Sequence, residues 1–187
     1  MLRPQGGPIL IFLDKEGVLP YNNDQKIGTE ELLMGGDMIA GLYRLPDETD
    51  TAGTRIVRAF VGDKPEILGF VRTHFPHWEG EIEHSLLQET PKCFLAVQDG
   101  RIVGVAAFDA SARGFFGPIG VDGSCRGQGL GRALLLRTLH AMREYGYAYA
   151  VIGWVDEAAE FYRKTVGAEF IPGGEPEHSV YSNKISL

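Results

Sequence analysis

The sequence predicts an α/β (α+β) fold in which helices cover both faces of a mixed central β-sheet. Short apolar segments typical of strands alternate with longer amphipathic segments typical of helices. The dipeptide Asp99-Gly100 joins two strand-like segments and is a strong signal for a two-residue hairpin. A glycine-rich loop connects a further strand to a helix that begins at Leu130. The chain has 187 residues, 44% of them hydrophobic, which is enough for one substantial core.

The elements before the glycine-rich loop follow in order. A strand is expected at residues 55–61, and the long amphipathic segment 64–89 is expected to form two helices. Pro76 disfavours helical backbone at the residue before it, so the break should lie at His74-Phe75-Pro76. Three further strands are expected at residues 93–98, 101–109 and 115–121.

The elements after the loop complete the sheet. The helix that begins at Leu130 should stop near Gly146, because glycine commonly ends helices. Residues 149–155 are short, apolar and β-rich, which is typical of a buried strand. A second helix is expected at residues 157–165, and closing strands are expected at residues 169–172 and 179–185. The order β-α-α-β-β-β-α-β-α-β-β implies a mixed sheet with helices on both faces.

Residues 1–53 are expected to form an N-terminal extension to a main domain at residues 54–187. Within the extension, residues 9–13 and 38–45 are expected to be strands that extend the sheet, cover its edge or pair with a second subunit, which leaves a homodimer open. The sequence Asp14-Lys15-Glu16-Gly17 is similar to the D-x-D-G motif of haloacid-dehalogenase-type phosphatases. Glu16 replaces the second aspartate, and the following residues lack the long αβ series of that fold. A phosphatase is therefore not favoured.

Composition and charge exclude several classes of protein. A net charge of −7 argues against a nucleic-acid partner, which would favour a basic face. The longest apolar runs, such as residues 9–13, are too short to span a bilayer, and the start lacks the features of a signal peptide. Two cysteines supply neither a disulfide framework nor a zinc site, so no metal is expected. Cys93 is expected in the core and Cys125 as an ordinary loop residue. These features favour a cytoplasmic protein.

The glycine-rich loop has the composition of an anion site. It contains Gly123, Arg126, Gly127 and Gly129 immediately before a helix. The first turn of a helix carries unpaired N–H groups and a partial positive charge, and glycines allow a phosphate to approach the backbone closely. Arg132 occupies the third glycine position of a dinucleotide fingerprint, and the G-K-S/T sequence of a P-loop is absent. The loop therefore predicts a phosphate ligand of another kind.

The spacing Arg126-x-x-Gly129-x-Gly131 after a strand resembles the GNAT superfamily of N-acetyltransferases. A second signature follows in the expected order, since Phe161-Tyr162-x-Lys164 before Gly167 is similar to that family's F-Y-x-K helix. The resemblance covers residues 54–187. The segment from Asp109 to Pro118 also resembles the corresponding segment of bacterial members whose acceptor is unassigned.

The resemblance implies acetyl-coenzyme A as acetyl donor. In the family the loop holds the pyrophosphate, and a bulged strand before it pairs with the pantetheine arm and donates a backbone N–H to the thioester carbonyl. The implied contacts are Ile119, Gly120, Val121, Arg126, Gly127, Gln128, Gly129, Leu130, Gly131 and Arg132. Pro118 and Gly120 are expected to make the pairing of this strand irregular, and the amides of Gly120 and Val121 are the candidate donors.

The resemblance also assigns a general acid. Tyr162 stands where many members carry the tyrosine that protonates the departing thiolate. Here Thr165 and Val166 separate Lys164 from Gly167, one residue more than the family pattern, and Glu157 stands near a position that often holds an asparagine.

The base that deprotonates an amine is less well defined. The candidates are Asp109 and Asp122, each at or just past the end of a strand. The region expected to line the acceptor pocket has several polar residues which, with Trp78, could form an acidic and aromatic cleft for a cation. They are His74, His77, Glu79, Glu81 and Glu83.

The function expected from these features is transfer of an acetyl group to an amine by direct attack in a ternary complex. The acceptor is expected to be a small-molecule or peptide amine. A non-catalytic acyl-coenzyme A sensor on the same fold is the alternative, and a different acyl donor or an oxygen acceptor also stays open.

Overall fold

The computed structural model describes residues 35–51 and 53–184, which form a seven-stranded mixed sheet in the order β2-β3-β4-β5-β6-β1-β7. Neighbouring strands are antiparallel except β5 and β6, which are parallel. The strands are β1 (Gly36–Gly41), β2 (Thr54–Arg58), β3 (Cys93–Gln98), β4 (Arg101–Phe108), β5 (Phe115–Val121), β6 (Tyr149–Val155) and β7 (Glu169–Phe170).

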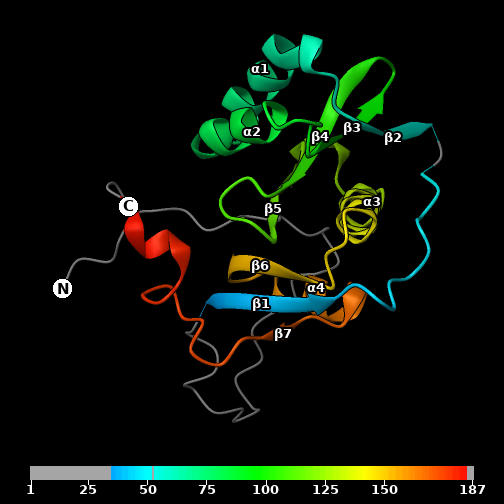
Figure 1. Ribbon diagram of the computed structural model, residues 1–187. Coiled ribbons are helices and arrows are strands. Elements are labelled where there is room, and N and C mark those ends of the chain that lie inside the picture. The colour runs from blue at the N-terminus through cyan, green and yellow to red at the C-terminus, as the bar shows by residue number, and fades with distance from the viewer. Residues whose placement is uncertain (1–34, 52, 185–187) are drawn as a thin grey trace, which may run out of the picture.

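Helices cover both faces of this sheet, as predicted (Figure 1). They are α1 (Lys64–His74), α2 (Glu79–Leu86), α3 (Leu130–Glu144) and α4 (Ala159–Val166). The apolar side chains of α1 and α2 pack on one face, in a core that includes Leu95 and Val105. Those of α3 and α4 pack on the other face, in a core that includes Phe116 and Ile119.

The predicted turns around β3 and β4 are confirmed. Asp99 and Gly100 join the two strands with φ angles of 49° and 75°, the left-handed backbone that a two-residue hairpin requires. The helix break is confirmed as well. α1 ends at His74, and a short 3₁₀ helix, η2 (Pro76–Trp78), separates it from α2.

The strand expected at residues 38–45 is β1, which begins two residues earlier and ends at Gly41. It extends the sheet beyond β6 and lies between β6 and β7. The division of the chain at residue 53 stays a prediction. The strand expected at residues 9–13 and the phosphatase-like Asp14-Lys15-Glu16-Gly17 lie outside the described residues.

The expectation of a last strand at residues 179–185 is wrong. Residues up to Lys184 instead contain a 3₁₀ helix, η4 (Val180–Asn183). Its backbone bonds are local, from the N–H of Ser182 to the carbonyl of Ser179 and from the N–H of Lys184 to the carbonyl of Tyr181. Tyr181 is nevertheless buried, so the segment covers the sheet without joining it.

Candidate functional site

β5 and β6 separate soon after they meet. Within the described residues their pairing consists of Phe115 with Val151 and Phe116 with Ile152. Each strand then carries a bulge. Gly117 and Pro118 of β5 stand opposite Ala107 of β4, and this is the irregular pairing expected at Pro118.

The bulge in β6 lies at the same level as the bulge in β5. Gly153 and Trp154 together oppose the single residue Asp37 of β1. Trp154 has a φ of 48°, which is uncommon for a large side chain, and its N–H donates to the Asp37 carboxylate at 2.8 Å. We call the region where residues 117–121 and 153–155 move apart the divergence of β5 and β6.

The amide directions along β5 distinguish the two candidate donors. The N–H of Asp122 donates to the carbonyl of Val103 on β4 at 2.8 Å. Successive amides in an antiparallel strand alternate in direction, so the N–H of Gly120 also points to β4 and that of Val121 points toward the divergence. The geometry therefore favours Val121 alone as the donor.

Glycine is required at residue 120 because a side chain there would collide with neighbouring rings. A Cβ at this position would lie 2.5 Å from Phe75 and 2.7 Å from Trp78, whose rings stack with centroids 4.6 Å apart. These two side chains bring α1 and η2 directly onto the backbone of β5. The sequence analysis did not find this role, because it depends on which rings the tertiary structure places over the strand.

The glycine-rich loop leads from β5 into α3 through a 3₁₀ turn, η3 (Gly123–Cys125). The carboxylate of Asp122 accepts from the N–H of Ser124 at 2.9 Å and from its hydroxyl at 3.0 Å. The guanidinium of Arg126 folds back beside Gly123. The loop is thus held by its own polar groups.

The start of α3 presents backbone to solvent. Gly127 and Gly129 have φ angles of 83° and 75°, and a Cβ at Gly129 would meet no atom within 4 Å. Gly129 is the N-cap, and no side chain caps the helix there. The exposed residues 127–129 therefore lead into N–H groups that can bind an anion. Of the other implied contacts, Leu130 and Ile119 are buried in the core, while Gln128 is exposed and Arg132 is partly buried.

The pKa of Asp122 lies below its ordinary value. The main cause is the hydrogen bond from the Ser124 N–H, which burial opposes, and the Ser124 hydroxyl, His74 and Arg126 lower the pKa further. The nearest atoms of His74 and Asp122 are 4.0 Å apart. A carboxylate held in this way stays ionised and is a weak base.

Tyr162 is almost completely buried at 1% exposure, and its hydroxyl has no hydrogen-bond partner among the described residues. Its ring packs edge to face on Phe116, the last β5 residue before the divergence, with centroids 6.2 Å apart. Burial raises the pKa of Tyr162, and the Tyr181 hydroxyl adds to the rise. An unpartnered buried hydroxyl carries a free-energy cost that a ligand can remove.

The extra residue before Gly167 is absorbed by α4. The helix runs to Val166, and Gly167 ends it with a φ of 65°. Helix α4 begins at Ala159 rather than at 157, and Glu157 is exposed. The ring of Phe161 reaches within 4.0 Å of a Cβ built on Gly131, so α4 lies beside the first turn of α3.

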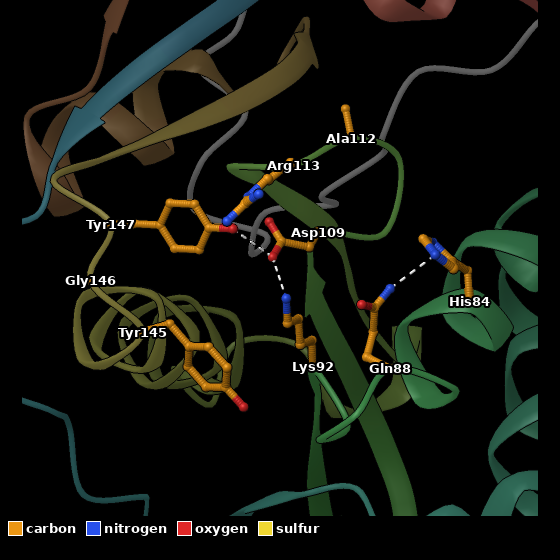
Figure 2. A pocket seen from close by; sticks show the side chains of 9 residues that line it. All are labelled: His84, Gln88, Lys92, Asp109, Ala112, Arg113, Tyr145, Gly146 and Tyr147. Atoms are coloured by element: carbon orange, nitrogen blue, oxygen red, sulfur yellow. Dashed lines mark hydrogen bonds and ion pairs between the residues drawn. The ribbon is translucent and has the colours of Figure 1, made fainter.

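Asp109 lies beside Lys92 and Tyr147 (Figure 2). It follows the end of β4, roughly 16 Å along the strand from the residue that pairs with Val121. Its carboxylate accepts from Lys92 at 2.5 Å, from Tyr147 at 2.8 Å and from the N–H of Gly114 at 2.6 Å. Asp109, Lys92 and Tyr147 line a cavity of about 530 Å³ beside the end of α3. The structure therefore does not bring Asp109 together with Val121 and the glycine-rich loop that follows it.

The three glutamates of the acidic run on α2 do not all point in the same direction around the helix. Residues two apart differ by about 200° around a helix, so Glu81 points away from both Glu79 and Glu83. Glu79 pairs with Arg72 at 2.6 Å, and Glu83 pairs with Lys64 at 2.6 Å. Glu81 instead accepts a hydrogen bond from Ser111. Trp78 is buried and His77 is exposed.

Residues 35–51 and 53–184 contain neither a membrane-spanning helix nor a cluster of metal-ligating side chains. No helix there has the length and apolar character to cross a membrane. No three His, Cys, Asp or Glu side chains there are grouped so that they could hold a metal ion. Both cysteines in this part of the chain are free thiols, with Cys93 buried and Cys125 partly buried.

Residues 56–168 match the model of the acetyltransferase (GNAT) family, and this region is more than half of the chain. The chain belongs to the GNAT family of acetyltransferases. The matched region contains the glycine-rich loop, both bulges facing the divergence and Tyr162. It contains neither β1 nor Tyr181.

Solved structures of GNAT proteins share the fold. A GCN5-related N-acetyltransferase from Sphaerobacter thermophilus matches with a TM-score of 0.58 and 20% identity, over 74% of this chain and 49% of that one. One from Kribbella flavida matches with a TM-score of 0.56 and 22% identity, over 76% of this chain and 55% of that one.

A glucosamine N-acetyltransferase region of a fungal multi-domain β-N-acetylglucosaminidase matches with a TM-score of 0.60 and 18% identity, over 74% of this chain and 20% of that one. The match thus spans between a fifth and about half of these three proteins. No curated protein matches this chain in sequence.

Proposed function

We propose that this GNAT protein transfers an acetyl group from acetyl-coenzyme A to an amine, in a ternary complex. The observation that carries the proposal is the buried, unpartnered hydroxyl of Tyr162 beside the divergence of β5 and β6. The exposed and uncapped start of α3 follows β5 by one loop. A donor with a phosphate at one end and a thioester at the other would use both features.

The residues present suit this donor. Residues 127–129 and the first amides of α3 would hold the pyrophosphate, with the guanidinium of Arg126 close by. β5 lacks a neighbour beyond Phe116 on its β6 side within the described residues, so amide groups of the pantetheine arm would pair there as an added strand. Acetyl-coenzyme A would supply an activated acyl carbon that a neutral amine can attack.

The Val121 amide would bind the thioester oxygen as negative charge develops on it. Its N–H points away from β4 and is fixed in a strand, so it needs no reorganisation during the reaction. Ile119 shares this direction and would bind the pantetheine arm. The Gly120 N–H points toward β4, so Gly120 would not donate to the thioester oxygen and would affect binding only through the backbone conformation of β5.

Tyr162 would donate its proton to the sulfur that leaves. Burial raises the pKa of Tyr162, and the same surroundings would raise the pKa of a thiol formed beside it. The proton affinities of the two groups would therefore rise together, so burial of both would not by itself prevent proton transfer from Tyr162 to the sulfur.

Asp122 and Asp109 are weak candidates for the base. The carboxylate of Asp122 is occupied by Ser124 and has a lowered pKa, so its proposed role is to shape the loop. Asp109 is held by Lys92 and Tyr147, distant along β4 from the residue that pairs with Val121. The proposed chemistry does not depend on either, because the proton that the attacking nitrogen loses would restore the Tyr162 hydroxyl after Tyr162 has protonated the thiolate.

The test is a thiol-release assay with acetyl-coenzyme A and a panel of amines, run on the wild type and on Tyr162→Phe across a range of pH. We expect turnover with at least one amine and a kcat reduced by about 10²-fold or more in Tyr162→Phe. The affinity for acetyl-coenzyme A, measured by calorimetry, should stay unchanged because the phenyl ring keeps its packing on Phe116.

The other outcomes separate the alternatives. Binding of acetyl-coenzyme A without turnover for any amine would favour a sensor, a role with which the complete burial of Tyr162 is also compatible. Absence of binding would contradict the proposed function.

A further inference from the structure

Tyr162 and Tyr181 lie on opposite faces of the sheet beside the divergence of β5 and β6. Tyr162 occupies the α4 face. On the other face, at the same level, lies the ring of Tyr181. A Cβ built on Gly153 would be 2.5 Å from this ring, and the ring centroid is 6.5 Å from that of Phe115 and 5.8 Å from that of Trp154.

A chain of hydrogen bonds links Tyr181 to α2. The Tyr181 hydroxyl donates to the Ser111 hydroxyl oxygen at 3.0 Å, and the Ser111 hydroxyl donates to the carboxylate of Glu81. Glu81 is the member of the acidic run that points toward the sheet, while Glu79 and Glu83 are neutralised by ion pairs. Helix α2 therefore directs one carboxylate toward Tyr181.

A second carboxylate lies on the other side of Tyr181. Asp37 is buried at 6% exposure, and it accepts from the N–H of Trp154 at 2.8 Å and from the Ser179 hydroxyl at 2.9 Å. The bond to Ser179 fastens the segment that carries Tyr181 to β1. Across residues 35–51 and 53–184, no lysine, arginine or histidine lies within ion-pair distance of Asp37 or Glu81.

The surroundings of Tyr181 are negative and aromatic. Burial raises the pKa of Tyr181, and the charges of Glu81 and Asp37 raise it further against the effect of Ser111. The ring already faces the cation of Lys184, whose Nζ lies 5.9 Å from the ring centroid. Two carboxylates without cationic partners beside aromatic rings favour a positively charged ligand.

An independent observation places the reacting end of that ligand. The unpartnered hydroxyl of Tyr162 is 1% exposed on the opposite face of the sheet. The ring of Tyr162 packs on Phe116 and the ring of Tyr181 packs on Phe115, the preceding residue of β5, so the two tyrosines flank the same part of this strand. A ligand beside Tyr181 is therefore close to the group that would protonate the leaving thiolate.

We propose that Glu81, Ser111 and Tyr181 form the acceptor subsite, and that this subsite selects an alkyl amine carrying a second positive charge. The inference rests on the proposed acetyl transfer. Glu81 binds the ammonium, and Ser111 links Glu81 to Tyr181. The ring of Tyr181 closes the subsite over Gly153 and limits its depth.

Calorimetry with three ligands of equal length tests the proposal. Diaminobutane, aminobutanol and γ-aminobutyrate share one ammonium and differ in their second end group, which is cationic, neutral or anionic. Each is titrated into the wild type, Glu81→Gln, Tyr181→Phe and Glu79→Gln, all saturated with coenzyme A so that no turnover occurs. Glu79→Gln is the matched control, because it removes a carboxylate from the same helix on its ion-paired side.

The expected result is that the wild type binds diaminobutane more tightly than aminobutanol, and γ-aminobutyrate least. Glu81→Gln should weaken diaminobutane binding about tenfold or more, the scale of one charge-assisted hydrogen bond, and Glu79→Gln should leave it unchanged. Tyr181→Phe should change the affinity less than Glu81→Gln, since the ring remains.

Equal binding of the three ligands by the wild type, or equal losses in Glu81→Gln and Glu79→Gln, would overturn the subsite. The titrations do not depend on catalysis, so they separate the two proposals. Selective diamine binding through Glu81 without any thiol release would contradict acetyl transfer and leave the subsite standing. Thiol release with an amine whose KM is insensitive to Glu81→Gln would contradict the subsite and leave acetyl transfer standing.

Discussion

The ring of Phe75 lies 2.5 Å from the position that a Cβ would take on Gly120. Phe75 and Trp78 are stacked and both buried, so neither ring can move aside without disturbing the core between α1, α2 and the sheet. The absence of a side chain at residue 120 thus allows the break between the two helices to rest on β5.

Gly120→Ala is therefore expected to destabilise the protein by about 1–3 kcal/mol through overpacking. Chemical denaturation measures the free energy of unfolding. Gly69→Ala is the control, because Gly69 lies within α1 and a Cβ there meets no atom within 4 Å. This control should be more stable than the wild type by about 0.5–1 kcal/mol. A neutral Gly120→Ala would contradict the close packing.

Gly129→Ala should weaken the binding of acetyl-coenzyme A about tenfold, because a methyl group would stand where the pyrophosphate approaches the start of α3. The cost in stability should be roughly 1–2 kcal/mol, from the φ of 75° alone. Gly173→Ala has the same steric freedom and a φ of 78°, away from that helix, and should show the stability cost with unchanged affinity. Calorimetry and thermal unfolding of both variants decide this.

Asp109→Asn should cost roughly 3 kcal/mol in the free energy of unfolding, because it leaves the side chain of Lys92, 17% exposed, without its carboxylate partner. The kcat of the folded fraction should be unchanged. Glu160→Gln, which removes an exposed partner of Arg163 and Lys164, should cost less than about 0.5 kcal/mol. A loss of kcat in Asp109→Asn with normal stability would restore Asp109 as a candidate base.

Asp122 should make the protein sensitive to acid. Its pKa is lower in the folded protein than in the unfolded chain, so its contribution to stability is present above the unfolded pKa and is lost as the pH falls through the folded pKa. The stability advantage of the wild type over Asp122→Asn should hold at neutral pH and disappear below about pH 4. Urea titrations of both proteins at neutral and acidic pH measure it; a difference independent of pH would argue against a lowered pKa.

Local sequence features were sufficient to predict most elements of this fold. β3, β5 and β6 have the expected ends, because hairpin glycines and apolar runs determine them within a few residues. Residues 179–185 contain Val180 and Tyr181 in a strand-like pattern, yet the segment forms η4. Burial of Tyr181 against Phe115 and Trp154 depends on contacts distant in sequence, which local pattern cannot reveal.

The candidate site, like the fold, could be predicted from local sequence only in part. The turn at Gly127 and Gly129 in the candidate phosphate loop was predictable from sequence, because both residues have positive φ angles that favour glycine. The direction of the Gly120 amide follows from the register of β4 and β5, and the selection of Glu81 from the acidic run follows from the position of α2 on the sheet. Neither relationship is encoded in spacing alone.

The position of β1 has a consequence for the order in which the protein folds during synthesis. Ala40 pairs with Ala150, and Met38 pairs with both Ile152 and Phe170. β1 must wait for two strands that follow it more than 100 residues later in the chain, and until these are synthesised both of its edges lack those partners. Closing so long a loop is slow, so the β6-β1-β7 half of the sheet should form after the β2–β5 half, and the Asp37 anchor of the acceptor side should be among the last parts to assemble.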